Sequence, residues 1–158
     1  MNKLVIAIPE SELLASFPAA VRMNVAAMET AGTEWNRVGE LLAGAPTVGV
    51  ALKGSSGFTD RLWSSVKSEF RQFMCGDANA YSDLRATWGE YEKKGAKAAT
   101  HALSAAIGAQ VGMAGAVLAP VVIWLLLVSV RIGKNALCKA LTVETPVPVL
   151  AKPDAPAP

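Results

Sequence analysis

Residues with catalytic or metal-binding chemistry are scarce in this sequence. His101 is its only histidine, and Cys75 and Cys138 are its only cysteines. No Cys, Asp or Glu stands at ligand spacing from His101, and no nucleophile motif is present, so neither a zinc site nor a catalytic triad is predicted. We therefore expect a protein that is not an enzyme, with no catalytic residues, no cofactor and no metal. His101 is interpreted as a polar residue at the mouth of a hydrophobic segment, with proton sensing as the alternative role.

A Gly- and Ser-rich stretch, LKGSSG at 52–57, has the setting of a phosphate-binding loop, because it follows a strand-like run and precedes a helix. The Walker pattern is absent: Gly44 and Gly49 have the required spacing, but Val50 follows in place of lysine. The loop is interpreted as a flexible turn. Nucleic acid is not an expected partner either, since the net charge is only +2 and the basic residues form no patch beyond the lysines of 93–97.

The hydrophobic residues of the chain are concentrated in its C-terminal third. Ala102–Val130 is a run of 29 residues without any Asp, Glu, Lys, Arg or His. Within it, residues 112–131, GMAGAVLAPVVIWLLLVSVR, have the length of a membrane-spanning helix. The 11 Val, Leu and Ile residues between Val111 and Val130 favour insertion by about 3–7 kcal/mol. The sequence therefore predicts one transmembrane helix.

Two other structures of this segment are less favoured. A core helix of a soluble bundle would need several amphipathic helices around it, and the apolar stripes upstream are expected to pack in a separate small core. A concealed hairpin, as in colicin-like pore formers, would need about 40 apolar residues. Its second arm would also carry Arg131 and Lys134 into lipid, which is costly. A single span is the expected structure.

Upstream of the span, apolar residues recur at intervals of three and four, which indicates amphipathic helices. The expected helices cover residues 17–30, 33–42, 60–75 and a stretch from 79 onward. Strand-like runs at 3–8 and 47–52 leave room for a minor β-ribbon. No proline lies between Tyr91 and Pro120, so the last helix is predicted to continue into the span. The expected fold class is mainly α: a small N-terminal helical domain, then one long helix continuing into a single transmembrane span.

The predicted domain boundaries follow these composition changes. A cytosolic helical domain is expected at 1–92, a juxtamembrane small-residue helix at 93–111, and the transmembrane helix at 112–131. Residues 132–158 form a charged and Pro-rich tail, with five of the nine prolines after position 141.

Small residues recur at every fourth position of the last predicted helix, on one face. A row of this kind lets a second helix backbone approach closely, which is how helices associate in lipid. We therefore predict a helix-packing face, with a kink near the proline that ends it. The face consists of Ala96, Thr100, Ser104, Gly108, Gly112, Ala116 and Pro120.

The topology cannot be read from charge, because three basic residues flank each end of the span. The first residues do not resemble a cleavable secretion signal. We therefore expect an integral protein of the plasma or inner membrane, with its N-terminal domain in the cytoplasm. Cys75 and Cys138 would then lie on opposite sides of the membrane, as two unpaired thiols.

The expected function is that of an anchor or assembly accessory subunit of a membrane complex, for example a transfer or secretion apparatus. The expected partners are the lipid bilayer, a second copy or another transmembrane helix, and a cytosolic protein bound through residues 1–92. The alternative is an oligomerising membrane-permeabilising protein of the holin-like or toxin-like kind. The pattern leaves open whether the helices associate with themselves or with a different partner.

Overall fold

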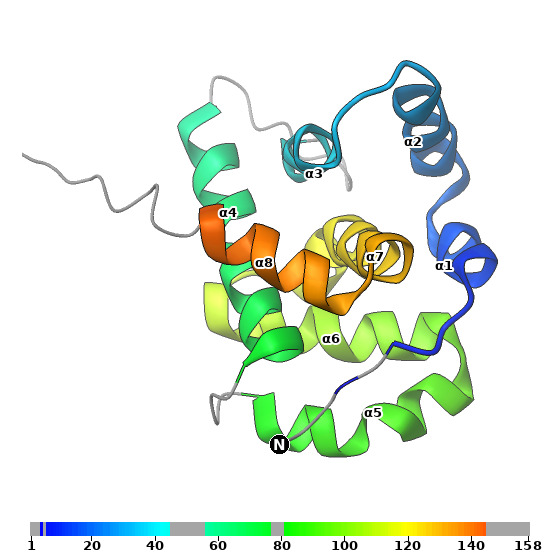
Figure 1. Cartoon of the computed structure of the whole chain (residues 1–158), viewed down its shortest axis with the longest axis vertical. Coiled ribbons are helices and arrows are strands. Elements are labelled where there is room, and N and C mark those ends of the chain that lie inside the picture. The colour runs from blue at the N-terminus through cyan, green and yellow to red at the C-terminus, as the bar shows by residue number, and fades with distance from the viewer. Residues whose placement is uncertain (1–3, 5, 45–55, 77–80, 145–158) are drawn as a thin grey trace, which may run out of the picture.

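The computed structural model describes residues 4, 6–44, 56–76 and 81–144, and this part of the chain is mainly helical (Figure 1). Its eight helices are α1 (Glu10–Ser16), α2 (Ala19–Thr30), α3 (Trp35–Gly44), α4 (Ser56–Cys75), α5 (Ser82–Lys94), α6 (Ala96–Val111), α7 (Gly115–Ile132) and α8 (Lys134–Glu144). The expectation of a mainly α fold is confirmed. No strand occurs within the described ranges: Leu4 and Ile8 are buried but unpaired with a second strand, and 47–52 lies outside those ranges.

The single long helix expected from residue 79 onward is wrong, because the structure divides it into α5, α6 and α7. The chain breaks at Gly95 and again at Gly112, where the backbone enters the left-handed region with φ +79°. Glycine adopts that conformation without the steric cost that other residues incur, and it commonly ends helices in this way. The N–H groups of Gly112 and Met113 both donate to the carbonyl oxygen of Gly108, which closes the C-terminal end of α6.

Helix α7 runs through the middle of the molecule (Figure 1). Ten consecutive residues, Pro120–Ser129, are buried, so every face of the helix is covered over nearly three turns. The covering comes from α1, α3, α4, α6 and α8, all of which contact α7. The separate N-terminal core expected from the sequence is not observed, since the buried residues of these helices and of α7 form one cluster. The amphipathic stripes therefore surround the hydrophobic helix.

The five helices that pack on α7, namely α1, α3, α4, α6 and α8, are called the cover below. The apolar stripe of α4 illustrates how the cover is built. All five residues expected on it are buried, and the rings of Trp63 and Trp35 meet edge to face across α3 and α4, with centroids 6.4 Å apart. The indole Nε1–H of Trp63 donates to the Oδ1 atom of Asn36 over 2.8 Å, so its polar atom is satisfied inside the contact. The stripe consists of Leu62, Trp63, Val66, Phe70 and Phe73.

Cys75 and Cys138 form a disulfide, which contradicts the expectation of two unpaired thiols. Their Cα atoms lie 5.8 Å apart although the residues are separated by 63 positions. The pairing is made because α8 turns back at Gly133 and packs on α4, instead of continuing away from the rest of the protein beyond α7. The disulfide thus joins the last residue of α4 to the middle of α8.

Candidate functional site

The most hydrophobic helix of the described part of the chain is α7. It has 18 residues, a mean hydropathy of 2.3 and no charged residue before Arg131. In the part of the chain that the structure describes, it is the one helix long and apolar enough to cross a membrane, and it is mostly buried in the bundle. Its length of about 27 Å is close to the thickness of the hydrocarbon core of a bilayer. Length and composition allow a span, and a buried core helix has the same properties.

Helices α6 and α7 form a tight hairpin joined by the short turn Gly112–Ala114. Its closest approach is at Gly108, where an added Cβ atom would lie 2.3 Å from the carbonyl oxygen of Met113. Gly115, at the start of α7, is similarly close to the backbone of Ala105, with a distance of 3.0 Å to an added Cβ. The turn of the hairpin therefore depends on the absence of side chains at these two glycines.

The predicted helix-packing face is divided between the two arms of this hairpin. Four of its seven residues lie on α6, and all four are buried there: Ala96, Thr100, Ser104 and Gly108. Gly112 lies in the turn. Ala116 is exposed on α7, whereas Pro120 is buried on that helix. The structure thus brings Thr100, Ser104 and Ala116 together, but from two helices that pack on each other, and not along one continuous face.

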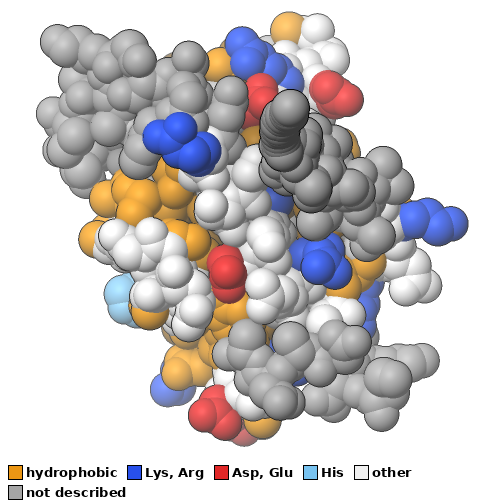
Figure 2. Space-filling view, turned by 90° about the vertical axis from the view of Figure 1, so that its left-hand side faces the viewer, with side chains coloured by type: hydrophobic (Ala, Val, Ile, Leu, Met, Phe, Trp, Pro, Cys, Tyr) orange, Lys and Arg blue, Asp and Glu red, His pale blue; other side chains and the backbone are white. Residues whose placement is uncertain are grey.

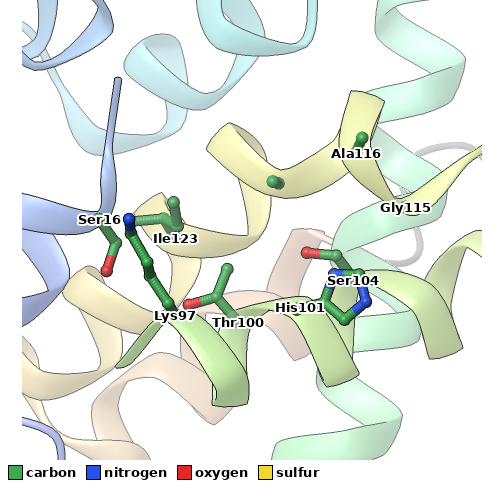
Figure 3. A pocket seen from close by; sticks show the side chains of 9 residues that line it. Ser16, Lys97, Thr100, His101, Ser104, Gly115, Ala116 and Ile123 are labelled. Atoms are coloured by element: carbon green, nitrogen blue, oxygen red, sulfur yellow. The ribbon is translucent and has the colours of Figure 1, made fainter. Parts of the chain in front are cut away.

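A groove of about 250 Å³ lies between α6, α7 and the end of α1 (Figure 3). Its walls combine polar and apolar side chains. The hydroxyls of Thr100 and Ser104 are buried and have no hydrogen-bond partner, and only 4% and 1% of these residues is exposed. Hydroxyls buried without a partner lower stability, so the contact between α6 and α7 is not fully optimised. The other lining residues are Ser16, Lys97, His101, Gly115, Ala116, Ala119 and Ile123.

His101 lies on the exposed side of α6, at the edge of this groove. Within the described ranges, no three His, Cys, Asp or Glu side chains come together as a candidate metal site. The Gly/Ser-rich loop at 52–57 falls mostly outside those ranges. The residues around the groove are thus a mixture of small, apolar and hydroxyl side chains with one lysine and one histidine.

The C-terminal end of α7 is held by an ion-pair cluster. Arg131 Nε contacts Glu10 Oε2 of α1 at 2.7 Å, and the Arg131 Nη1 atom contacts Glu29 of α2. Two carboxylates thus face one guanidinium at this end of the helix. The cluster joins the end of α7 to α1, which packs on it, and to α2.

A second polar contact lies within α7. Trp124 Nε1 donates a hydrogen bond of 2.9 Å to the backbone oxygen of Trp35, at the start of α3. This indole is buried, and it anchors the middle of α7 to the cover. Neither this contact nor the Arg131 cluster was predicted, because both join residues about 90 or more positions apart and carry no local sequence signal.

The site thus consists of the α6–α7 hairpin, the helices that cover it and the disulfide between α4 and α8. No protein-family model, curated protein or solved structure matches this chain. Its function is therefore inferred from the hairpin, its cover and the disulfide.

Proposed function

We propose that the chain is a non-enzymatic membrane-active protein that keeps α7 covered in a helical bundle and transfers it into a lipid bilayer. One observation supports this most strongly. The length and apolarity of a membrane span are combined, in one helix, with burial on every side by amphipathic helices. In water the bundle hides this apolar surface, and in a membrane the lipid chains hide it as well. The two environments therefore compete for the same helix.

The energies of the two environments are similar in size. Insertion of the 11 Val, Leu and Ile residues of α7 is favourable by about 3–7 kcal/mol. A folded domain is stable against unfolding by about 5–15 kcal/mol. A membrane in contact with the protein can therefore offset much of the free energy that keeps α7 in the bundle.

The outer surface of the bundle suits a protein that first folds in water. Figure 2 shows one face, on which apolar side chains reach the surface among lysine, arginine, aspartate and glutamate side chains. In the described part of the chain, the side-chain hydrogen bonds and ion pairs of α7 with other helices involve Arg131 and Trp124, whereas the Ser129 hydroxyl donates within α7 to the carbonyl oxygen of Leu126. Its remaining contacts are largely apolar, and lipid can replace them without loss of hydrogen bonds. Release of α7 therefore breaks few interactions that a membrane cannot restore.

After insertion, the proposed activity is permeabilisation of the bilayer by association of several copies, as in holin-like or toxin-like proteins. A helix that stays buried until the protein contacts a membrane suits a protein that diffuses through water before it inserts. The second candidate is an anchor or accessory subunit of a membrane complex. It is favoured by Met23 on α2, of which 71% is exposed, and by Leu41 on α3, which give the cover apolar contact points for a protein partner.

The disulfide bears on the location of the protein. Disulfides persist in oxidising environments and are rare in the cytosol, where thiols are kept reduced. We therefore propose that the covered bundle resides on the oxidising side of a membrane. This replaces the cytoplasmic placement of residues 1–92 expected from the sequence.

The proposal is tested with purified full-length protein and phospholipid vesicles that contain a self-quenched dye, with and without dithiothreitol. Vesicles are floated through a gradient after an alkaline carbonate wash, and dye release is followed in parallel. Carbonate-resistant flotation with dye release supports permeabilisation, and flotation without release supports the anchoring role. Protein that stays at the bottom of the gradient under both conditions overturns the membrane proposal.

A matched pair of charge substitutions separates insertion from surface binding. Ala119→Glu places a carboxylate at a half-buried position of α7 that lines the same groove as Lys97. In a bilayer this charge opposes insertion by about 2–3 kcal/mol, so carbonate-resistant flotation should fall about tenfold or more. Ala20→Glu adds the same charge at an exposed position of α2 and should leave flotation unchanged. Equal flotation of both variants would show that α7 does not enter the lipid.

A further inference from the structure

The disulfide and α7 are connected by the order of the chain. Cys75 is the last residue of α4 and precedes the hairpin, whereas Cys138 lies in α8 and follows it. The loop that the disulfide closes therefore contains α5, α6 and α7. Any movement of α7 out of the bundle takes place inside this closed loop.

A single span of α7 is incompatible with the closed loop. In that topology α4 stays on one side of the membrane and α8 emerges on the other, separated by a helix of about 27 Å. The Cα atoms of Cys75 and Cys138 lie 5.8 Å apart in the bundle, and a disulfide tolerates little more than that. The two cysteines can stay bonded only if the chain crosses the bilayer a second time.

The described helices offer no good second span. Helix α6 has 16 residues and carries Lys97 and His101, and α7 alone in this part of the chain has the length and apolarity of a span. Helix α8 is held on the bundle by the disulfide and also by Leu137 and Leu141, which are buried. With the disulfide intact, α8 cannot leave the side on which α4 lies.

We propose that the Cys75–Cys138 disulfide is a redox lock on membrane crossing: α7 crosses the bilayer as a single span only after a thiol reductant has opened the disulfide. This inference rests on the proposed membrane activity and specifies its regulation. Reduction does not itself remove the cover, because the apolar contacts of α8 and the ion pairs of Arg131 remain. It removes the one covalent link that forbids the crossing.

The chemistry is thiol–disulfide exchange with a dithiol reductant. One thiolate of the reductant attacks a cysteine sulfur, the S–S bond breaks, and a mixed disulfide forms. The second thiolate of the reductant then displaces that cysteine sulfur. Two electrons pass to the protein, both cysteines become protonated thiols, and the reductant leaves as a disulfide. Cys75 and Cys138 are only partly buried, so a small dithiol has access to them.

The test compares three samples of the full chain on vesicles: oxidised wild type, wild type reduced with dithiothreitol, and the Cys75→Ser/Cys138→Ser variant without reductant. We expect carbonate-resistant insertion of the reduced wild type and of the variant to exceed that of the oxidised protein at least about tenfold. The variant must also give the same result with and without dithiothreitol, which excludes an effect of the reductant on the vesicles. Circular dichroism checks that the variant keeps its helix content. The reduced wild type tests the effect of an open disulfide on insertion without any substitution.

Single-cysteine variants show on which side of the membrane Cys75 of α4 and Cys138 of α8 lie after insertion. After insertion under reducing conditions, a membrane-impermeant maleimide added outside should label Cys75 in the Cys138→Ser variant. It should not label Cys138 in the Cys75→Ser variant until the vesicles are opened with detergent. Labelling of both residues from outside would overturn the lock, because α8 would not have crossed.

The outcomes also separate the lock from the membrane proposal. Equal insertion of the oxidised and reduced protein overturns the lock and leaves the membrane activity standing. If none of the three samples inserts, the membrane proposal fails, and the lock fails with it.

Discussion

The two arms of the hairpin have similar lengths and lack acidic residues, yet they are built for different surroundings. Helix α6 buries one side with small and apolar residues, and it exposes Lys97, His101 and Ala105 on the other. Helix α7 carries large apolar residues on every side and is buried all round from Pro120 to Ser129. Absence of acidic residues alone therefore does not define a membrane span. The presence or absence of a polar face distinguishes an interface helix from a helix that water cannot solvate.

Removal of the disulfide should have the largest effect on stability, because it opens the loop that contains both arms of the hairpin. Closure of a loop of 63 positions is worth about 4 kcal/mol in the chain-entropy account. We expect the Cys75→Ser/Cys138→Ser variant to lose about that amount of unfolding free energy, measured by urea denaturation. Wild type in dithiothreitol is the matched control and should match the variant. A loss of less than about 1 kcal/mol would show that α8 stays on α4 without its covalent link.

Truncation inside α7 should have the next largest effect. Leu126 is completely buried, so Leu126→Ala should lower the free energy of unfolding by about 2–5 kcal/mol through lost burial and the cavity left behind. Leu41→Ala on α3 removes the same atoms from a side chain that is 41% exposed, and it should cost markedly less. Similar losses in both variants would mean that α7 is not the centre of the core.

The close approach of the two arms gives a smaller and more specific prediction. Gly108→Ala would place a Cβ atom against the backbone of the hairpin turn, and we expect a loss of about 1–3 kcal/mol. Gly89→Ala on α5 is the control, since no atom lies near its added Cβ. Alanine favours helix over glycine, so this control should gain about 0.5–1 kcal/mol. In thermal denaturation, the melting temperature should therefore fall for Gly108→Ala and rise for Gly89→Ala. An unchanged melting temperature for Gly108→Ala would contradict the tight turn.

The ion pairs of Arg131 should contribute least, because the side chains are partly exposed. Glu29→Gln should lower the unfolding free energy by about 0.5–1 kcal/mol, and added salt should reduce the difference. Glu12→Gln on α1 removes an exposed carboxylate that makes no such pair with Arg131 and should have a smaller effect. A cost for Glu29→Gln that is unaffected by salt would indicate a packing role.

Local patterns in the sequence predicted individual helices well. The stripe of α4 repeats at three- and four-residue spacing, and each of its five apolar residues is buried as expected. The helix expected at 17–30 is α2, shortened at its start because Pro18 serves as its N-cap. These elements are determined by contacts between near neighbours, which periodicity records directly.

The arrangement of the helices could not be predicted in the same way. Gly112 lies within a helical pattern, and whether it continues the helix or ends it depends on the contact between Gly108 and the turn. The pairing of Cys75 with Cys138 requires α8 to fold back over α4, a fact about tertiary structure alone. The hydrophobicity of α7 indicates that the helix must be shielded from water, but it does not indicate whether lipid or protein shields it.

The most direct test of the transfer of α7 from bundle to bilayer is amide hydrogen–deuterium exchange of the reduced protein, with and without vesicles. In water, peptides from α7 should exchange most slowly, since the helix is buried all round. With vesicles, α7 should stay protected while peptides from α1, α3 and α8 gain deuterium, because the cover has lost the helix on which it packs. If the covering helices remain as protected with vesicles as without them, α7 has not left the bundle, which contradicts its transfer into the bilayer.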